Sequence, residues 1–504
     1  MATDRSIDDD ESVVDWASLR NQREGVVNLA VGHPHPSALP NDALARAMAS
    51  AGSKLASRSP GALPLSYVAR EGAPATLGTF AEFLSRRFRD EMRPDALFVT
   101  NGVSHGLDLA CAALAQPGDV VVLELPTYFL AADIFKDRGL RVEGVPGKAS
   151  GRRGGGSFDV DAFETRLEQG LRPAFVYLVP THGNPRGRTM PSRDRARLVE
   201  LARKFDFFVV ADEVYHALDW SANGGPPPRF AQIERDMGTR VEERIGVDAW
   251  APPSDADPTR RPNATQRDED LEPTASEDLE PYAVAPGEPS ERFASEAAVA
   301  SRASRLAGNT SARCVSVSSF SKILAPGVRV GWIEAAPPLL RAVADRGYVA
   351  SGGCVAPFAA AVVAEAIANG DQDAFLDALV RRYRVNADAL ADAMRLEGAD
   401  IGWGDVEAPE GGYFLWGPIP EGVSEAALAR CAAEEGVAYL PGARCIPAGA
   451  EGRGDGAEGG RFVRLCFAFL DEEGLREGAR RLAVAARRAL GELGGGGSRT
   501  DALG

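Results

Sequence analysis

Short apolar runs alternate with amphipathic stretches along most of this chain. Turn residues flank each run, so the runs are typical of buried strands: Ala96–Thr100, Val120–Glu124, Phe175–Val179, Phe207–Ala211 and Cys314–Val317. Between them, Ser104–Ala115 and Arg193–Phe205 have the spacing of amphipathic helices. Strands and helices in alternation predict an α/β fold, with a mostly parallel sheet between two layers of helices.

Length and charge exclude two classes of protein. The longest mostly apolar stretch, Cys354–Ala364, is followed by Glu365 and is well short of the roughly 20 residues that a membrane helix requires. The 56 Lys and Arg residues and 72 Asp and Glu residues of the 504-residue chain give a net charge of −16. We therefore expect neither a membrane span nor the basic surface of a nucleic-acid-binding protein.

The first residues and the cysteines bear on the compartment. Met1–Glu11 contains five acids and one arginine, unlike the basic start of a signal peptide or an acid-poor transit peptide. The six cysteines include no C-x-x-C pair, which favours inert thiols in a reducing compartment over disulfides or metal ligands. We expect a cytoplasmic protein without a bound metal.

One segment differs from the rest of the chain in composition. Residues 251–300 hold eight prolines, twelve acids and four arginines, so the net charge of the segment is 4 − 12 = −8. Such a segment has too few apolar side chains to offset the entropy of ordering. We expect a disordered insert with edges near Ser221 and Thr310, which is either a plain solvated loop or a docking or regulatory element. The tail Gly494–Gly504 is also expected to be flexible.

Polar residues follow two of the predicted strands, at the edge where α/β proteins bind ligands. Asp212 comes directly after Phe207–Ala211, and a buried acid stays ionised only when a cation or a strong donor meets it. Lys322, after Cys314–Val317, lies among serines and is followed by Arg329, a pattern that suits anion binding or a Schiff base. From the residues alone, a helix N-cap at Asp212 and a surface position for Lys322 stay open as alternatives.

Turns follow two other predicted strands. Asn101–Gly106 opens a helix, whose free N–H groups and dipole favour a phosphate, although a plain serine cap explains Ser104 equally well. Pro180–Gly187 is a rigid turn that presents Asn184 to a ligand. Each of these signals is weak when it stands alone.

Together and in this order, the motifs resemble those of fold-type-I pyridoxal-phosphate enzymes, specifically the class I/II aminotransferases. Ser319–Trp332 is similar to the S-F-S-K-x-L-A-P-G-x-R-x-G-W form of the branch that contains aminoadipate, kynurenine and broad-specificity aminotransferases. The resemblance extends from about Val27 to Leu490 and is interrupted by the acidic segment. It implies pyridoxal 5'-phosphate as the cofactor, bound by a large α/β domain that is joined to a smaller α/β domain.

The resemblance also implies a role for the motif residues around the cofactor ring. Lys322 would form the Schiff base and then act as general base and general acid. Asp212 would pair with the pyridine nitrogen and keep the ring protonated. Asn184 and Tyr215 would hydrogen-bond the phenolic oxygen of the ring, and Tyr128 would stack on the ring face and share in catalysis.

By the same resemblance, three segments form a phosphate site. Its expected residues are Val103, Ser104, Ser319, Ser321 and Arg329. The arginine offers a bidentate guanidinium, and the first two residues offer backbone N–H groups at a helix start. Tyr67 resembles the tyrosine that reaches the phosphate across a dimer interface, so the resemblance implies a homodimer.

Substrate contacts come from both ends of the chain in the related enzymes. Arg464 matches the arginine that binds the α-carboxylate, and Gly32 matches the glycine whose backbone approaches it. Asn184 is expected to contact the substrate as well. Tyr413 and Trp416 belong to a stretch that lies near the substrate in this branch, although ordinary strand packing explains them equally well.

Several residues depart from the family pattern. Val103-Ser104-His105 stands where many relatives have Ser-Gln-Gln, and His182-Gly183 stands where an aromatic residue and Gln are frequent. Arg186 replaces the usual threonine. All five histidines lie in or beside the motifs: His33, His35, His105, His182 and His216. Solvated or capping histidines are the ordinary interpretation, and a histidine-lined substrate pocket is the alternative.

The resemblance divides the chain into regions. We expect an acidic flexible N-terminus at 1–26, a large cofactor-binding domain at 57–345 with the insert at about 221–310, a small domain formed by 27–56 and 346–490, and a Gly-rich tail at 491–504.

The expected activity is transfer of an amino group between an L-amino acid and a 2-oxo acid through the Lys322 Schiff base. A C–S or α,β-lyase, or an enzyme of the aminocyclopropane-carboxylate-synthase type, shares Lys322, Asp212 and Arg464 and stays open as the alternative. A non-catalytic, cofactor-sensing regulator is disfavoured because only about 25 residues precede the resemblance. The sequence does not identify the amino acid, because a single methylene in a pocket changes discrimination by only about 1–3 kcal/mol.

Overall fold

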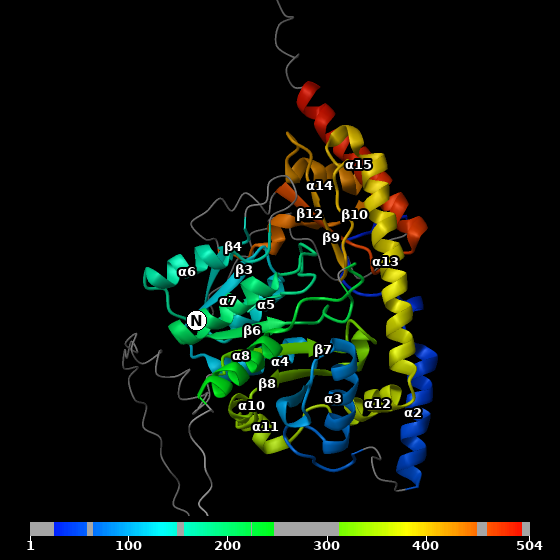
Figure 1. The fold of residues 1–504 in the computed structure, drawn as a ribbon. Coiled ribbons are helices and arrows are strands. Elements are labelled where there is room, and N and C mark those ends of the chain that lie inside the picture. Colours follow the sequence, from blue (N-terminus) through cyan, green and yellow to red (C-terminus); the bar gives the residue numbers. More distant parts are fainter. Residues whose placement is uncertain are drawn as a thin grey trace, which may run out of the picture.

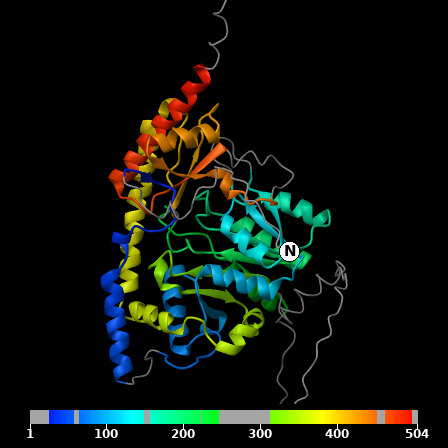
Figure 2. The same cartoon turned by 180° about the vertical axis from the view of Figure 1, so that it is seen from behind.

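A computed structural model describes residues 25–57, 64–148, 156–222, 224–245, 312–450 and 461–495 of the chain. A seven-stranded sheet and a three-stranded sheet are the main β-structures of these residues, and helices pack against both (Figure 1). A long helix extends from the level of the larger sheet to that of the smaller one (Figures 1 and 2).

The larger sheet has the strand order β2-β8-β7-β6-β5-β3-β4. Its strands are β2 (Leu97–Thr100), β3 (Val120–Leu125), β4 (Arg141–Pro146), β5 (Pro173–Leu178), β6 (Phe208–Asp212), β7 (Cys314–Ser319) and β8 (Gly331–Ala335). Neighbouring strands are parallel except at β8, which is antiparallel to β2 and to β7. The prediction of an α/β fold with a mostly parallel sheet is therefore confirmed, and all five predicted strands are present.

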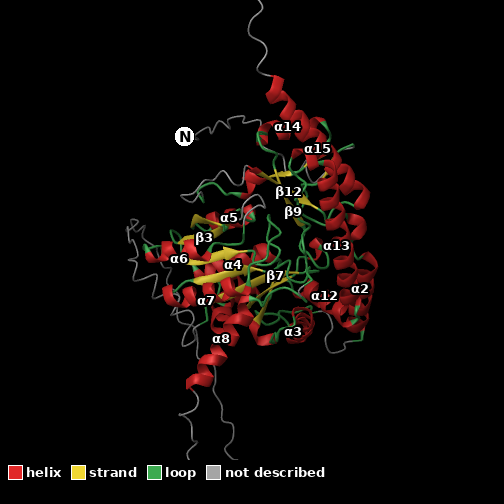
Figure 3. Ribbon diagram, turned by 45° about the horizontal axis from the view of Figure 1, so that its top comes forward, coloured by secondary structure: helices red, strands yellow, loops and turns green. Residues whose placement is uncertain are grey.

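Helices cover both faces of this sheet (Figure 3). They are α3 (Pro74–Phe88), α4 (Val103–Leu114), α5 (Phe129–Asp137), α6 (Val160–Glu168), α7 (Ser192–Phe205), α8 (Phe230–Ile245), α10 (Pro337–Ala344) and α11 (Gly347–Gly352). The alternation along β3 shows why two layers are needed: Val121 and Leu123 pack in the core that includes α3, α4 and α5, whereas Val120 and Val122 pack in the core that includes α6, α7 and α8.

The smaller sheet is antiparallel and has the strand order β11-β12-β9. Its strands are β9 (Phe414–Pro418), β11 (Leu440–Pro441) and β12 (Phe462–Cys466), and a short parallel pair joins β1 (Val27–Asn28) to β10 (Val437–Ala438). The long helix α13 (Asp371–Glu397) and α14 (Glu425–Glu434) both pack on α15 (Glu472–Gly495). The 3-10 turns are Pro36–Ala38, Pro94–Ala96, Pro326–Val328, Ala399–Ile401 and Gly442–Cys445.

Two helices that were expected in the small domain, α2 (Asn41–Ala56) and α12 (Pro357–Ala368), pack together beside the larger sheet. Helix α2 packs along α12, and α12 also packs on α3. In Figure 1 both helices lie at the level of the larger sheet, away from α14 and β12. The division into 27–56, 57–345 and 346–490 stays a prediction.

The expected edge of the acidic insert near Ser221 is wrong. The described residues continue to Ile245 and include α8, which packs on α7 and β7 and buries Phe230 completely. A helix with a buried apolar face belongs to the core of the larger domain, so any insert begins after Ile245. The tail was expected to begin at residue 491, but α15 continues to Gly495. Residues 246–311, 1–24 and 496–504 lie outside the described residues.

Candidate functional site

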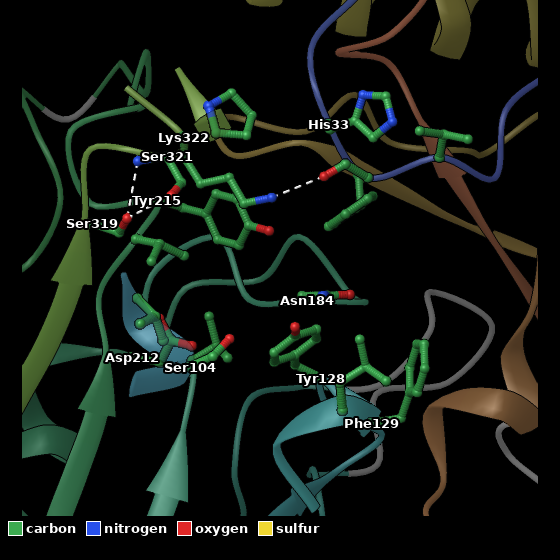
Figure 4. Close-up of a pocket in the computed structure, with 18 of the residues that line it drawn as sticks. His33, Ser104, Tyr128, Phe129, Asn184, Asp212, Tyr215, Ser319, Ser321 and Lys322 are labelled. Carbon is green, nitrogen blue, oxygen red and sulfur yellow. Dashed lines mark hydrogen bonds between the residues drawn. The ribbon is translucent and has the colours of Figure 1, made fainter. Parts of the chain in front are cut away.

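A cavity of about 310 Å³ lies where the carboxyl ends of β6 and β7 face the smaller sheet. The predicted site residues that line it are Gly32, Val103, Ser104, Tyr128, Asn184, Asp212, Tyr215, Ser319, Ser321, Lys322, Arg329 and Arg464. Twelve of the thirteen predicted residues therefore meet at one place, and Tyr67 is the exception. Figure 4 shows how several of them point toward the same space.

Asp212 is the last residue of β6 and is only 3% exposed. The Tyr177 hydroxyl, on the neighbouring strand β5, donates a hydrogen bond of 2.9 Å to its Oδ2. Its Oδ1 is buried and has no hydrogen-bond partner among the described residues. Burial raises the pKa of Asp212 to about 7, although the Tyr177 hydrogen bond opposes this rise. A buried carboxylate oxygen without a partner is ready to receive a donor from a bound molecule.

Lys322 lies in the turn after β7 (Cys314–Ser319), and its side chain crosses the cavity. Its Nζ donates a hydrogen bond of 2.8 Å to the Gly32 carbonyl oxygen (Figure 4) and lies 5.0 Å from the centre of the Tyr413 ring. Burial, more than any nearby charge, lowers the pKa of Lys322 to about 8. A lysine with such a pKa is neutral, and therefore nucleophilic, in a much larger fraction of molecules near neutral pH than an exposed lysine.

An anion-binding cradle lies at the start of α4. Gly102 precedes the helix with φ of +79°, and no side chain caps the first N–H groups. A Cβ at Gly102 would lie 2.5 Å from Nη2 of Arg329, so only glycine allows the guanidinium to approach the helix start. Val103 and Ser104 are the first two helical residues, and the serine is therefore not the N-cap. Free N–H groups beside an arginine form a site for a phosphate group.

Two serines complete the cradle. The Ser319 hydroxyl donates to the Ser321 hydroxyl at 2.8 Å, and the Ser321 N–H donates to the Ser319 oxygen at 2.9 Å. Nη1 of Arg329 donates to the Ser321 oxygen at 3.3 Å, and its Nη2 donates to the Asn101 carbonyl oxygen at 3.1 Å. The strand β7, the turn that carries Lys322 and the start of α4 therefore present their polar groups to one corner of the cavity.

Two tyrosines line the part of the cavity near Asp212. Tyr128 immediately precedes α5, and burial raises the pKa of its hydroxyl to about 12, so the side chain is neutral. Tyr215 is buried, and its pKa lies well above the ordinary value for the same reason. Its ring packs against Tyr413 at 5.4 Å. Both hydroxyl groups face the cavity in Figure 4, where they can serve as hydrogen-bond donors.

Arg464, on β12, faces the cavity from the smaller sheet and is 5% exposed. Its Nη1 donates to Oδ1 of Asn184 at 3.1 Å, and its Nη2 donates to the Ala30 carbonyl oxygen at 2.9 Å. The guanidinium carbon lies 4.1 Å from the centre of the Phe414 ring. A Cβ at Gly32 would be 3.1 Å from the same ring. The guanidinium is thus held in one plane beside the Gly32 backbone, as bidentate carboxylate recognition requires.

Some of the predicted residues lie outside the cavity. Tyr67 is 85% exposed on the surface, so its proposed reach across a dimer stays a prediction. Tyr413 is buried beneath Lys322 and donates to its carbonyl oxygen at 3.0 Å. Trp416 stacks on Phe462 at 5.4 Å and does not line the cavity, so strand packing is the correct interpretation for this residue.

The histidines do not line the pocket as a group. His33 alone among them borders the cavity (Figure 4). His35 packs against Phe469, and His105 contacts the Tyr348 hydroxyl. His182 and His216 are buried and do not line the cavity; His216 is hydrogen-bonded to the Thr181 hydroxyl, and His182 is paired with Asp219. The hypothesis of a histidine-lined substrate pocket is therefore wrong for the described residues.

Three residues of the site lacked a clear sequence signal. Tyr177 lies in the predicted apolar strand Phe175–Val179. Its hydroxyl was the only sequence signal that it could be a hydrogen-bond partner of Asp212. Phe414 packs on the guanidinium of Arg464, and Phe129 at the start of α5 lines the cavity. Phe129 occupies an ordinary apolar position, where a sequence pattern does not distinguish core packing from a cavity wall. Phe414 belongs to the same family-like stretch as Tyr413 and Trp416, but the pattern did not show its contact with Arg464.

Comparison with known proteins decides the family. The family model "Aminotransferase class I and II" matches residues 24–237 and 288–482, and it leaves out 238–287, which overlap the acidic segment. The chain belongs to the class I and II aminotransferases. As a member of this family it is a pyridoxal-phosphate-dependent transaminase.

Relatives with established names agree with this assignment. Aromatic-amino-acid aminotransferase 1 of Thermococcus litoralis is 26% identical and covers 91% of this chain and 87% of its own length. The 2-aminoadipate transaminase of Thermus thermophilus is 26% identical over 93% of this chain and 92% of its own length. The crystal structure of LysN from Thermus thermophilus, an α-aminoadipate aminotransferase in complex with N-(5'-phosphopyridoxyl)-L-leucine, superposes with a TM-score of 0.64, 26% identity and coverage of 93% and 94%.

The residues of the cavity fit pyridoxal 5'-phosphate. The α4 cradle suits the phosphate, and the unpartnered Oδ1 of Asp212 suits a protonated ring nitrogen. Lys322 has a pKa that leaves its amine available to an aldehyde. Among the described residues, no group of three or more His, Cys, Asp or Glu is arranged to hold a metal ion, and no helix is both long and apolar enough to cross a membrane.

Proposed function

We propose that Lys322, Asp212 and Arg464 divide the work of amino-group transfer between an L-amino acid and a 2-oxo acid. The observation that carries this proposal is their convergence on one cavity from three segments of the chain. When bound, pyridoxal phosphate supplies an aldehyde that accepts the amino group and a ring that withdraws electrons from the reacting carbon. In this proposal Asp212 supplies a negative charge, Arg464 orients the substrate and Lys322 carries the proton.

Lys322 is the proposed proton carrier. Its amine is held at the Gly32 backbone, on the side of the cavity where Arg464 would place the carboxylate of the substrate. A buried amine with a pKa of about 8 takes and returns a proton at comparable cost near neutral pH. We propose that it moves the proton between the α-carbon of the substrate and the bound cofactor.

Asp212 is the proposed partner of the ring nitrogen. Its carboxyl has a pKa of about 7 in the protein alone, and a positive charge opposite Oδ1 stabilises the ionised form. The Tyr177 hydroxyl holds the other oxygen, so the carboxylate keeps one orientation. Tyr128 is proposed to cover the ring face, and Tyr215 with Asn184 to bind the phenolic oxygen. Their positions in the cavity wall support these roles.

The phosphate would be held by the α4 cradle, and the substrate by Arg464. Arg329, the two serines and the first N–H groups of α4 are the proposed phosphate ligands. Arg464 with Gly32 and Asn184 is the proposed α-carboxylate site. In the structure Nη1 and Nη2 of Arg464 each donate one hydrogen bond, to Asn184 and to Ala30, and the buried Nε has no partner among the described residues, so further N–H groups are available to a carboxylate.

We also propose that the active unit is a homodimer. Exposed large apolar side chains support it: Leu65 is 74% exposed, Tyr67 85%, and Tyr348 and Phe358 about half. The segment that carries Tyr67 lies against the end of α11, because a Cβ at Gly353 would be 2.5 Å from the Val68 carbonyl oxygen. Tyr67→Ser should weaken the dimer in analytical ultracentrifugation and raise the cofactor dissociation constant.

The cytoplasmic location stays a prediction.

The substrates of named relatives guide the choice of amino acids. Aromatic amino acids and 2-aminoadipate are the donors that these names indicate, and we propose both classes for the first assays. A panel of donors with 2-oxoglutarate and pyruvate as acceptors tests the activity directly. Transamination should appear with at least one pair. Release of ammonia and a 2-oxo acid without an acceptor would instead support the lyase alternative, which no feature of the described residues favours.

A further inference from the structure

His182 occupies an unusual position in the turn that carries Asn184. Its side chain is 2% exposed, and its backbone has φ of +47°, a conformation that non-glycine residues adopt rarely and at a cost. Its backbone N–H donates to the Thr189 hydroxyl oxygen at 3.1 Å, which closes the turn. Because this buried histidine is only two residues from Asn184, which lines the cavity, an interaction of its side chain must stabilise the strained backbone.

The partner of the ring is Asp219. Nε2 of His182 lies 2.7 Å from Oδ2 of Asp219, whose side chain is 9% exposed. The carboxylate accepts only, so Nε2 carries a proton. Nδ1 lies 3.2 Å from the Thr189 hydroxyl, which can donate to it. The other oxygen of Asp219 accepts from the N–H and hydroxyl of Ser221, at 3.2 and 2.9 Å. Both ring nitrogens and both carboxylate oxygens are therefore engaged.

Two glycines make room for this ring. A Cβ at Gly411 would lie 2.1 Å from Nε2 of His182, and a Cβ at Gly412 would lie 2.8 Å from its Cβ. Asp219 forms a β-bridge with Gly411, and the Gly412 N–H donates to the Leu218 carbonyl oxygen at 2.9 Å. The ring is thus enclosed by three segments: its own turn, the segment after Tyr215 and the segment that enters β9.

Two short routes lead from His182 to Arg464. Along its own turn, Asn184 accepts a hydrogen bond from Nη1 of Arg464 at 3.1 Å. Through the glycines, Phe414 follows Gly412 by two residues and supports the guanidinium at 4.1 Å. The turn also touches Phe414 directly, because a Cβ at Gly187 would be 2.8 Å from its carbonyl oxygen. His182 therefore lies on the turn that carries Asn184 and packs on the segment that carries Phe414, the two neighbours of the guanidinium.

We propose that His182 and Asp219 form a positioning pair that sets the geometry of the Arg464 carboxylate site. The pair acts through Asn184 and Phe414 and touches neither substrate nor cofactor. This inference rests on the proposed role of Arg464. A bidentate site tolerates little displacement of either donor, so a shift of the turn lowers affinity for the carboxylate.

The test is a double-mutant cycle with His182→Phe, Asp219→Asn and the combined variant. Phenylalanine keeps a flat ring on Gly411 and removes both ring nitrogens. It leaves the Asp219 carboxylate buried without its partner, a loss that Asp219→Asn relieves. His182→Phe should therefore weaken carboxylate binding by about 10- to 100-fold. The combined variant should be less impaired than the product of the two single effects predicts.

The readouts separate positioning from a general loss of stability. The dissociation constants of L-phenylalanine, L-2-aminoadipate and 3-phenylpropionate should rise together, because all three carry the carboxylate. Cofactor affinity and the absorbance of the bound cofactor should stay unchanged, and kcat at saturation should fall by no more than about threefold. Arg188→Gln is the matched control: it lies on the same turn, paired with Glu407 at the surface, and should leave every constant unchanged.

Three outcomes would overturn the proposal. Unchanged 3-phenylpropionate affinity in a folded His182→Phe variant would show a structural role only. Loss of cofactor binding at normal melting temperature would place the effect on the other part of the cavity, and strictly multiplicative effects in the cycle would show that the two residues act separately. Arg464→Ala, measured in parallel, tests the proposed carboxylate site itself. If that variant binds 3-phenylpropionate normally, the proposed function of Arg464 fails independently of the pair.

Discussion

The two halves of the cavity are built in different ways. The cofactor half is formed by Ser104, Asp212, Lys322 and Arg329. These residues lie near the ends of strands of the larger sheet and at the start of α4, which packs on that sheet. The carboxylate half, formed by Gly32, Asn184, Phe414 and Arg464, draws on both chain ends and on a turn between them.

The electrostatics of the halves differ as well. Burial lowers the pKa of Lys322 to about 8 and raises that of Asp212 to about 7, so both groups in the cofactor half can change protonation near neutral pH. The carboxylate half relies on a guanidinium, which stays charged, and on its orientation by Asn184 and Phe414. One half is tuned by burial and the other by geometry, so mutations in the two halves should give different kinetic signatures.

The largest effect should follow from Lys322→Ala. This change removes the proton carrier and the amine that reacts with the cofactor aldehyde, so transamination should fall by roughly 10⁴-fold or more. Cofactor binding should become weaker and non-covalent, because the α4 cradle remains. Borohydride reduction followed by a tryptic map measures this: the wild type should carry the adduct on Lys322. An adduct on another lysine would remove Lys322 from the cofactor half.

Substitution of Arg464 should give the next largest effect, and it should weaken substrate binding without weakening cofactor binding. Arg464→Ala should raise the dissociation constants of amino donors and 2-oxo acids by about 100-fold, because a bidentate, charge-assisted contact in a buried site is lost. Arg464→Lys keeps the charge but not the fork and should lose most of the same affinity. Half-reaction spectroscopy with several donors measures both variants. Saturation like that of the wild type in Arg464→Ala would contradict the carboxylate role.

This contrast also explains what the sequence could predict. The residues of the cofactor half lie in contiguous motifs at strand ends, so the resemblance located them without long-range information. The surroundings of Arg464 depend on packing between segments hundreds of residues apart. The sequence singled out His182 and the stretch around Phe414, but it did not show that His182 pairs with Asp219 or that Phe414 supports Arg464. Tyr177 was missed for a related reason: its hydroxyl reaches Asp212 across neighbouring strands, which no periodicity records.

Helix α8 illustrates the opposite error. Three prolines precede Phe230 and an acidic, proline-rich segment follows the helix, so composition grouped the helix with the insert. In the structure the preceding residue, Arg229, is buried with the carboxylates of Asp90, Glu213 and Glu334. Burial alone would lower the pKa of Arg229, but the carboxylates together outweigh it and raise the pKa. Local composition does not reveal that carboxylates distant in sequence surround one arginine. The same cluster ties α8 to Glu213, directly after Asp212.

A smaller effect is expected from a pH experiment that measures how the charge of Arg464, in the carboxylate half, affects Lys322 in the cofactor half. Cofactor capture requires a neutral Lys322 amine, so its rate in apoprotein should rise about tenfold between pH 7 and pH 9 and level off above the pKa of about 8. An ordinary lysine would give a rise that continues to about pH 10.5. The charge of Arg464 also lowers this pKa, so Arg464→Ala should move the midpoint to higher pH. Stopped-flow absorbance measures both curves, and a midpoint above pH 10 in the wild type would contradict the effect of burial.

The smallest effect should come from the acidic, proline-rich segment 251–300. Deleting residues 251–300 leaves α8, Arg229 and every residue of both halves in place, so kcat/KM should change by less than about twofold, since loop length alters closure entropy by only about 0.6 kcal/mol per doubling. Deleting 224–304 instead removes α8 with its buried Phe230, and also Arg229, the partner of Asp90, Glu213 and Glu334, so stability should fall by at least about 3–5 kcal/mol. Thermal unfolding and the two dissociation constants, for cofactor and for amino donor, compare the variants. If the shorter deletion weakens one constant and spares the other, that half of the cavity depends on the acidic segment, and the segment has a function beyond that of a loop.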